Sequence, residues 1–252
     1  MIILNKKQKD SFIKVMTLNV NGFRRIGNRG LSNQFCLRNM KQIRQLIDTV
    51  MINKNNIIIL QEVPHKIKDN QRGWYNNPLY NKFMEVFQNY KILKPKYLID
   101  SNQCTVAVCR KDSSWKQLQN DILQYNSRYS YGNKFVELQC SDLTLLGVHM
   151  PVKNEMWNLL LQALKDTPYT YVIGDFNANE KRGEMHNKPK KIRDCGYNNL
   201  IANNVITCYS YQSSIDNIFI RSNFTTEENV AVKVVNTHLT DHALCSFEHS
   251  LN

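Results

Sequence analysis

The sequence predicts an α/β fold with mixed β-sheets, and three observations lead to that prediction. Short apolar runs typical of buried strands alternate with segments whose apolar residues recur at helical intervals. A helical pattern followed by a strand pattern, over residues 37–60, is typical of the crossover that joins parallel strands. Closely spaced strand patterns over residues 105–148 instead favour an antiparallel meander, so both kinds of pairing are expected.

Each expected element follows from its own pattern. In residues 37–51, apolar side chains recur every three or four positions opposite Lys41, Arg44 and Asp48, which predicts a helix; residues 154–165 form a second. Residues 179–193 are basic, lack a period and are expected to be a long exposed loop. The expected strands are residues 13–20, 56–61, 105–109, 134–138, 143–149, 169–173 and 214–220.

Length, composition and charge limit the possible functions. The chain has 252 residues, 42% of them hydrophobic, and we expect residues 1–252 to form one soluble domain that acts as a monomer. Lys and Arg outnumber Asp and Glu by 33 to 21, a net charge of +12 that attracts polyanions such as nucleic acid or anionic lipid. The alternative is that this excess only reflects the base composition of the genome.

Nothing in the sequence predicts export or a membrane span. Residues 1–11 hold one apolar run of three residues, which is short of a secretory signal, and no apolar stretch approaches the roughly 18 residues of a spanning helix. The seven cysteines are scattered singly, without a Cys-x-x-Cys pair, which favours buried free thiols over disulfides or a zinc site. We therefore expect a cytoplasmic protein without membrane partners.

Polar side chains able to bind metal or transfer protons gather at the ends of the expected strands. Taken singly, the asparagines and aspartates could be ordinary turn residues, and each histidine could be structural. They occur, in chain order, in the segments LNVNG, LQEV, GVHMP, IGDFNA, SIDNIF and TDHAL.

In that order, the six segments resemble the motifs of the endonuclease/exonuclease/phosphatase superfamily. Its members include deoxyribonuclease I, abasic-site endonucleases of the exonuclease III type, neutral sphingomyelinases and inositol polyphosphate 5-phosphatases. The segments span residues 17–244, nearly the whole chain. The resemblance implies a four-layer α/β sandwich, with two mixed sheets face to face, helices outside, and the site between the sheets at one end.

The resemblance also implies a metal site. Hydrolysis of an anionic phosphodiester requires neutralised charge at the phosphate, a base for the attacking water and stabilisation of the leaving oxygen. Glu62 matches the central ligand of Mg²⁺ or Mn²⁺, for which carboxylate and amide oxygens are suitable. The other residues expected at the metal are Asn21, Asn19 and Asp241.

The catalytic residues follow from the same resemblance. Asp175 matches the residue that orients and deprotonates the water, and Asn177 would donate its amide to the phosphate, because alternate residues of an extended chain project to one side. His242 matches the catalytic histidine, and the carboxylate of Asp216 would fix its tautomer and favour its cationic form.

His149 indicates a branch of the superfamily. Deoxyribonuclease I and sphingomyelinases carry His in this region, whereas abasic-site endonucleases carry Tyr. In deoxyribonuclease I a glutamate pairs with this histidine; the nearest candidate position here holds Gln103, so a different orientation of His149 is expected.

The basic residues favour DNA as the substrate, cleaved with little sequence preference. A solvated surface is the alternative for any one of them. A phosphatase or sphingomyelinase-like enzyme remains open, although no lipid-binding hairpin or membrane helix is evident. A non-catalytic binding module is a further alternative, but the intact set of catalytic residues speaks against it. The residues expected to bind substrate are Arg24, Arg25, Arg29, Lys190 and Lys191.

Overall fold

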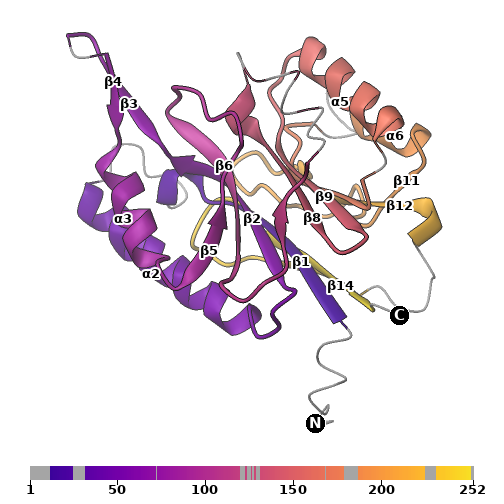
Figure 1. Cartoon of the computed structure of the whole chain (residues 1–252), viewed down its shortest axis with the longest axis horizontal. Helices are drawn as coiled ribbons and strands as arrows, with labels where there is room; N and C mark the ends of the chain where they lie inside the picture. The colour runs from indigo at the N-terminus through magenta and orange to yellow at the C-terminus, as the bar shows by residue number, and fades with distance from the viewer. Residues whose placement is uncertain are drawn as a thin grey trace.

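Two six-stranded sheets lie face to face in the computed structural model, with helices on their outer sides (Figure 1). The structure describes residues 12–24, 32–71, 73–119, 123, 126, 128, 131–167, 169–178, 187–224 and 231–250. The first sheet has the spatial order β13 (Ala231–Val235), β14 (Leu244–Ser250), β1 (Phe12–Asn19), β2 (Ile57–Pro64), β6 (Gln103–Arg110) and β5 (Tyr90–Leu93). The second has the order β11 (Tyr197–Asn199), β12 (Asp216–Arg221), β10 (Tyr171–Asp175), β9 (Leu143–His149), β8 (Phe135–Cys140) and β7 (Lys116–Gln117).

Helices cover both outer faces. On one side of Figure 1, α2 (Asn33–Val50) and α3 (Pro78–Val86) lie over the first sheet; on the other, α5 (Asn154–Asp166) and α6 (Lys188–Asp194) lie over the second. A small hairpin, β3 (Lys66–Asp69) and β4 (Gly73–Asn76), projects away from the body of the molecule. Short 3₁₀ turns are η1 (Asn21–Phe23), η2 (Gly132–Lys134) and η4 (Ser222–Phe224).

Three apolar clusters separate these four layers. Met40 and Ile43 of α2 pack with Leu60 of the first sheet, Ile59 packs with Ile173 between the sheets, and Trp157 of α5 packs over the second sheet. The sheets approach closely at Gly147, where an added Cβ would lie 2.7 Å from Val136 Cγ2 and 2.9 Å from Ile59 Cγ2. Burial of these faces is the main stabilising contribution, and the expected four-layer sandwich is confirmed.

The expected mixture of pairings is also confirmed. β1 runs parallel to β2, the strand that follows α2, and β9 runs parallel to β10, the strand that follows α5. Neighbours of these central pairs, such as β14 and β12, run antiparallel to them. Parallel pairing places the carboxyl ends of β1 and β2 together, and likewise those of β9 and β10.

Each of the seven expected strands and both expected helices is present, with ends shifted by a few residues. The single meander expected over residues 105–148 is wrong, because β6 belongs to the first sheet while β8 and β9 form a hairpin in the second. The loop expected over residues 179–193 is also wrong in part. Residues 179–186 lie outside the described residues, but residues 188–194 form α6, with Pro189 in its first turn and Ile192 buried. A proline in the first turn is compatible with a helix because that position needs no hydrogen bond.

The seven cysteines are free, and all but Cys195 are buried. Within the described part of the chain, no helix is both long and apolar enough to span a bilayer.

Candidate active site

Four strands end at one edge of the sandwich and carry the candidate residues there. Asn19 is the last residue of β1 and Glu62 lies near the end of β2, while His149 and Asp175 close β9 and β10. Ligand atoms of Glu62, His149 and Asp175 lie within 4.8 Å of one another, although these residues come from both sheets. The fold therefore brings together side chains that are far apart in sequence.

The buried Asn19 amide joins the two sheets at this point. Its Nδ2 donates to Glu62 Oε1 and to Asp175 Oδ2, at 2.9 Å in each case. Its Oδ1 accepts from the backbone N–H of Asn21 at 2.9 Å. Asn19 thus orients both carboxylates, and its own oxygen is directed to the backbone.

Unusual backbone conformations place three of the candidate side chains. Asn21, Glu62 and Asn177 have φ values of 45°, 56° and 48°, in the left-handed region that costs energy for residues other than glycine. Glu62 also lies where the register between β2 and β6 shifts, between Leu60 and Val63. Such a bulge turns a side chain out of the regular alternation, which directs Glu62 toward Asn19.

Asp241 extends the same network. Its Oδ1 accepts from Asn21 Nδ2 at 2.9 Å, and its Oδ2 accepts from Ser210 Oγ at 2.8 Å. The neighbouring Thr240 Oγ1 donates to the backbone oxygen of Asn19 at 2.8 Å. The segment that carries Asp241 is therefore fastened to the end of β1.

His242 and Asp216 form a buried pair. His242 Nδ1 lies 2.8 Å from Asp216 Oδ2, and both side chains are less than a tenth exposed. Although burial opposes the charged imidazole, the adjacent Asp216 carboxylate raises the pKa of His242 well above its ordinary value. His242 is therefore protonated at neutral pH and presents a cation to the site.

Asp175 lies in surroundings that disfavour its charged form. Burial first, and then the nearby Asp216 carboxylate, raises the pKa of Asp175 to about 7, against the opposing influence of His242 and of the N–H donors of Asn177 and Asn19. A carboxyl group with a pKa near neutrality can accept a proton from water and release it again. Such perturbed groups are typical of catalytic sites.

Asn177 lies beside Asp175 but is directed inward. Its backbone N–H donates to Asp175 Oδ1 at 2.8 Å, and its Nδ2 donates to the backbone oxygen of Met150 at 2.9 Å. Donation to a phosphate requires Asn177 to exchange this second hydrogen bond.

His149 is oriented by a residue that the sequence did not indicate. Lys134 Nζ lies 3.0 Å from His149 Nδ1, and His149 Nε2 lies 3.6 Å from Glu62 Oε1. Burial, Lys134 and then His242 lower the pKa of His149 well below its ordinary value, so the ring is neutral. With Nδ1 accepting from the ammonium, the proton lies on Nε2 and faces Glu62.

Gln103 does not contact His149 through any described hydrogen bond; instead, its Nε2 donates to Glu62 Oε2 at 2.7 Å. Lys134, and not Gln103, is therefore the residue that orients His149. Only the position of Lys134 as the first residue of an expected strand could have indicated it, and a single lysine among so many is not a distinctive signal.

The three expected substrate-binding residues that the structure describes do not form one group. Arg24 is exposed next to the site and lines a cavity beside it. Arg25 and Arg29 lie outside the described residues. Lys190 and Lys191 are exposed on α6, which packs against α5, and neither lines that cavity.

The donor set fits a divalent cation. Glu62 keeps about a fifth of its side chain exposed, its carboxylate is held by two neutral amides, and Asp175 and Asp241 add further carboxylate oxygens nearby. Hard oxygen donors of this kind suit Mg²⁺ or Mn²⁺.

The sequence matches no protein-family model and no curated protein sequence. The structure, however, is similar to solved structures over nearly its whole length. The endonuclease domain of TRAS1, a telomere-specific non-LTR retrotransposon, has a TM-score of 0.63 at 14% identity, over 95% of this chain and 99% of that one. A 3′ phosphatase from Neisseria bound to product DNA hairpin has a TM-score of 0.61 at 13% identity, over 94% and 99%.

An AP endonuclease from Archaeoglobus fulgidus has a TM-score of 0.60 at 13% identity, over 93% of this chain and 98% of that one. Proteins described as endonuclease/exonuclease/phosphatase are also among the similar structures. Four of the six motifs lie at the ends of β1, β2, β9 and β10, and SIDNIF and TDHAL lie where β12 and β14 begin. The chain therefore has the fold of the endonuclease/exonuclease/phosphatase superfamily.

Proposed function

We propose that this chain is a divalent-metal-dependent phosphoester hydrolase, and specifically an endonuclease that cleaves DNA with little sequence preference. The proposal includes residues 1–252 as a single domain acting as a monomer. One observation carries it: the Asn19 amide joins Glu62 to Asp175, and Asp175 in turn lies within 4.8 Å of the His242–Asp216 pair. A metal-ligand candidate, a base and a cation thus surround one small space.

The residues divide the reaction between them. Glu62, with Asn21 and Asp241 around it, would hold the cation, which when bound would neutralise charge on the phosphate. Asn19, whose Oδ1 accepts from the backbone N–H of Asn21, would support the cation by orienting the two carboxylates. Asp175 takes the proton of the attacking water, and Asn19 and the backbone of Asn177 hold its carboxylate in place.

Charge on the phosphate is stabilised from the other side of the site. His242, kept cationic by Asp216, stabilises the charge that develops at the phosphate. His149, neutral and protonated on Nε2, lies 3.6 Å from Glu62 Oε1. When substrate binds, the Nε2–H donates to a phosphate oxygen instead.

The experiment offers supercoiled plasmid, an abasic oligonucleotide, RNA and sphingomyelin in parallel, with Mg²⁺ or Mn²⁺. Nicking of plasmid that EDTA abolishes is expected. Cleavage of the abasic oligonucleotide alone would contradict the branch indicated by His149. Cleavage of sphingomyelin alone would replace the nuclease with a lipid phosphodiesterase on the same site.

Glu62→Gln is expected to weaken metal binding by at least about tenfold, because it removes the negative charge that the two amides orient. Calorimetric titration with Mn²⁺ measures this independently of activity. Asp112→Asn, which removes an exposed carboxylate paired with Arg110, is the matched control. Equal Mn²⁺ affinity in the wild type and Glu62→Gln would exclude Glu62 as a ligand.

Lys134→Met is expected to lower kcat by up to about 100-fold, the lower end of what acid–base groups contribute. The reason is that the His149 ring is then free to carry its proton on Nδ1. KM should change little, and Lys134→Arg should recover part of the rate because it restores a cationic donor. If Lys134→Arg is as slow as Lys134→Met, a hydrogen bond to His149 is not what Lys134 contributes.

A further inference from the structure

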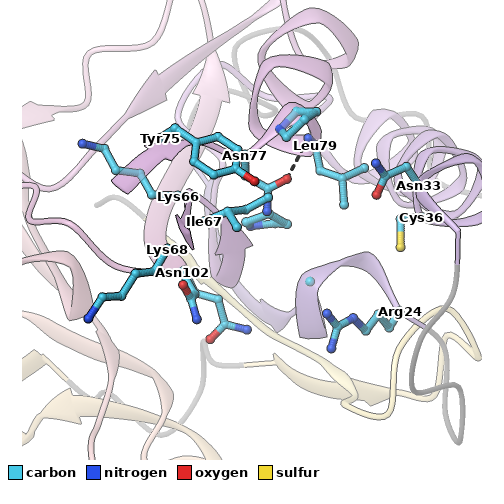
Figure 2. A pocket seen from close by; sticks show the side chains of 14 residues that line it. Arg24, Asn33, Cys36, Lys66, Ile67, Lys68, Tyr75, Asn77, Leu79 and Asn102 are labelled. Atoms are coloured by element: carbon cyan, nitrogen blue, oxygen red, sulfur yellow. Dashed lines mark hydrogen bonds between the residues drawn. The ribbon is translucent and has the colours of Figure 1, made fainter. Parts of the chain in front are cut away.

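A cavity of about 750 Å³ lies directly beside the candidate active site. Gln103, one of its lining residues, donates to Glu62 Oε2 at 2.7 Å, and Gly22, another, follows Asn21 in the chain. Its other walls come from α2, from the β3–β4 hairpin and from the start of α3 (Figure 2). A polymer whose scissile phosphate lies at Glu62 has this cavity as an adjacent space for its flanking residues.

The walls of the cavity are positively charged. Arg24, Lys66 and Lys68 line it, and no carboxylate is among its described lining residues. Figure 2 shows Arg24 and Lys68 on opposite sides of the hollow. Lys66 is paired with Asp100, whereas neither Arg24 nor Lys68 has an ion pair within the described part of the chain. Two exposed cations on opposite sides of a concavity favour an anionic chain that crosses it.

An exposed aromatic ring completes the cavity. Tyr75 on β4 is 43% exposed and pairs across the hairpin with Ile67, and both residues line the cavity. Residues paired across two strands project to the same face, so the apolar side chain of Ile67 lies beside the ring. Aromatic rings placed next to cations are the usual platform on which unpaired bases stack.

We propose that this cavity binds the unpaired strand that flanks the scissile phosphate, with its backbone between Arg24 and Lys68 and a base on Tyr75. This inference rests on the proposed nuclease function and specifies its substrate as nucleic acid with a single-stranded segment at the site. An anionic membrane is the other surface that a hairpin with aromatic and basic residues could meet. Because the cations line a concavity, a chain that can enter it fits better than a flat membrane surface.

The test measures binding of a fluorescein-labelled oligothymidylate by fluorescence anisotropy. EDTA is present so that metal-dependent hydrolysis cannot occur during the measurement. Tyr75→Ala is expected to weaken binding about tenfold, and Tyr75→Phe to bind like the wild type, because stacking needs only the ring. Lys68→Ala and Arg24→Ala should each reduce the slope of log affinity against log salt by about 0.7.

Two controls lie at the other end of the first sheet. Lys54→Ala removes an exposed lysine that precedes β2, and Phe12→Ala removes a ring of similar exposure, 39%, at the start of β1. Both should bind oligothymidylate like the wild type. If Tyr75→Ala and Lys68→Ala bind as tightly as these controls, the cavity does not hold the strand.

Vesicles of phosphatidylserine and sphingomyelin separate the two occupants. Loss of vesicle binding in Tyr75→Ala and Lys68→Ala, with unchanged oligothymidylate binding, overturns the proposal in favour of a membrane. Failure of the proposed function is distinguishable: a wild-type protein that cleaves no phosphodiester with Mg²⁺ or Mn²⁺ can still lose oligothymidylate binding on Tyr75→Ala.

Discussion

His242→Ala is expected to lower kcat by about 10²- to 10⁴-fold with little change in KM, the range for loss of one acid–base group. The ring is buried, hydrogen-bonded to Asp216 and held cationic, so it contributes mainly when charge develops at the phosphate. His238→Asn is the matched control, because His238 is exposed four residues earlier and has a left-handed backbone that Asn tolerates.

The pH profile tests the same pair. Asp216 is what raises the pKa of His242 against burial, so the active cation is lost only as the pH rises well above the ordinary histidine value. The alkaline limb of kcat/KM should disappear in His242→Ala and move to lower pH in Asp216→Asn, where the supporting charge is gone. Asp216→Asn added to His242→Ala should cost little more, since the two act as a unit. An alkaline limb that is unchanged in Asp216→Asn would contradict this assignment.

The central strands could be predicted from the sequence because burial on both faces makes them continuous apolar runs. β2, with residues Ile57 to Leu60 all fully buried, and β10 are examples. The polar residues at their ends stand out against that background, which is why Glu62 and Asp175 could be identified as candidates.

Other elements have no comparable signal. β14 pairs with the central strand β1, yet its polar residues Ser246 and Glu248 interrupt the apolar pattern and hide the strand. The β3–β4 hairpin is short, polar and partly exposed, so no core-facing period marks it. β14 forms because of a partner distant in sequence, which local patterns do not encode, whereas β3 and β4 pair with each other across a short turn.

The same limit applies inside the site. The sequence could suggest that Asn19 belongs there, but not that its amide would donate to Glu62 and Asp175 at once. Likewise, Lys134 and Tyr75 gain their significance only from what the fold places beside them, His149 in one case and an open cavity in the other.

Asp175→Asn is expected to lower kcat by about 10²- to 10⁴-fold, because an amide cannot accept the proton of the attacking water. In the wild type, burial and then Asp216 raise the pKa of Asp175 to about 7. The base is therefore lost as the pH falls through that value, and kcat/KM should drop about tenfold for each further pH unit. Added Mg²⁺ favours the carboxylate, so this acid limb should move to lower pH as the concentration of Mg²⁺ rises.

Asn19→Ala locates the acid limb on Asp175. The Asn19 amide donates to the carboxylate and so lowers the pKa of Asp175; its removal should raise that pKa and shift the limb to higher pH. Asn56→Ala, which removes another buried asparagine at the opposite end of β2, controls for loss of stability without a change in the limb. If the limb stays in place in Asn19→Ala, or if Asp175→Asn retains most of its kcat, the proton of the attacking water goes to a different group, and Asn19 only fastens β1 to β10.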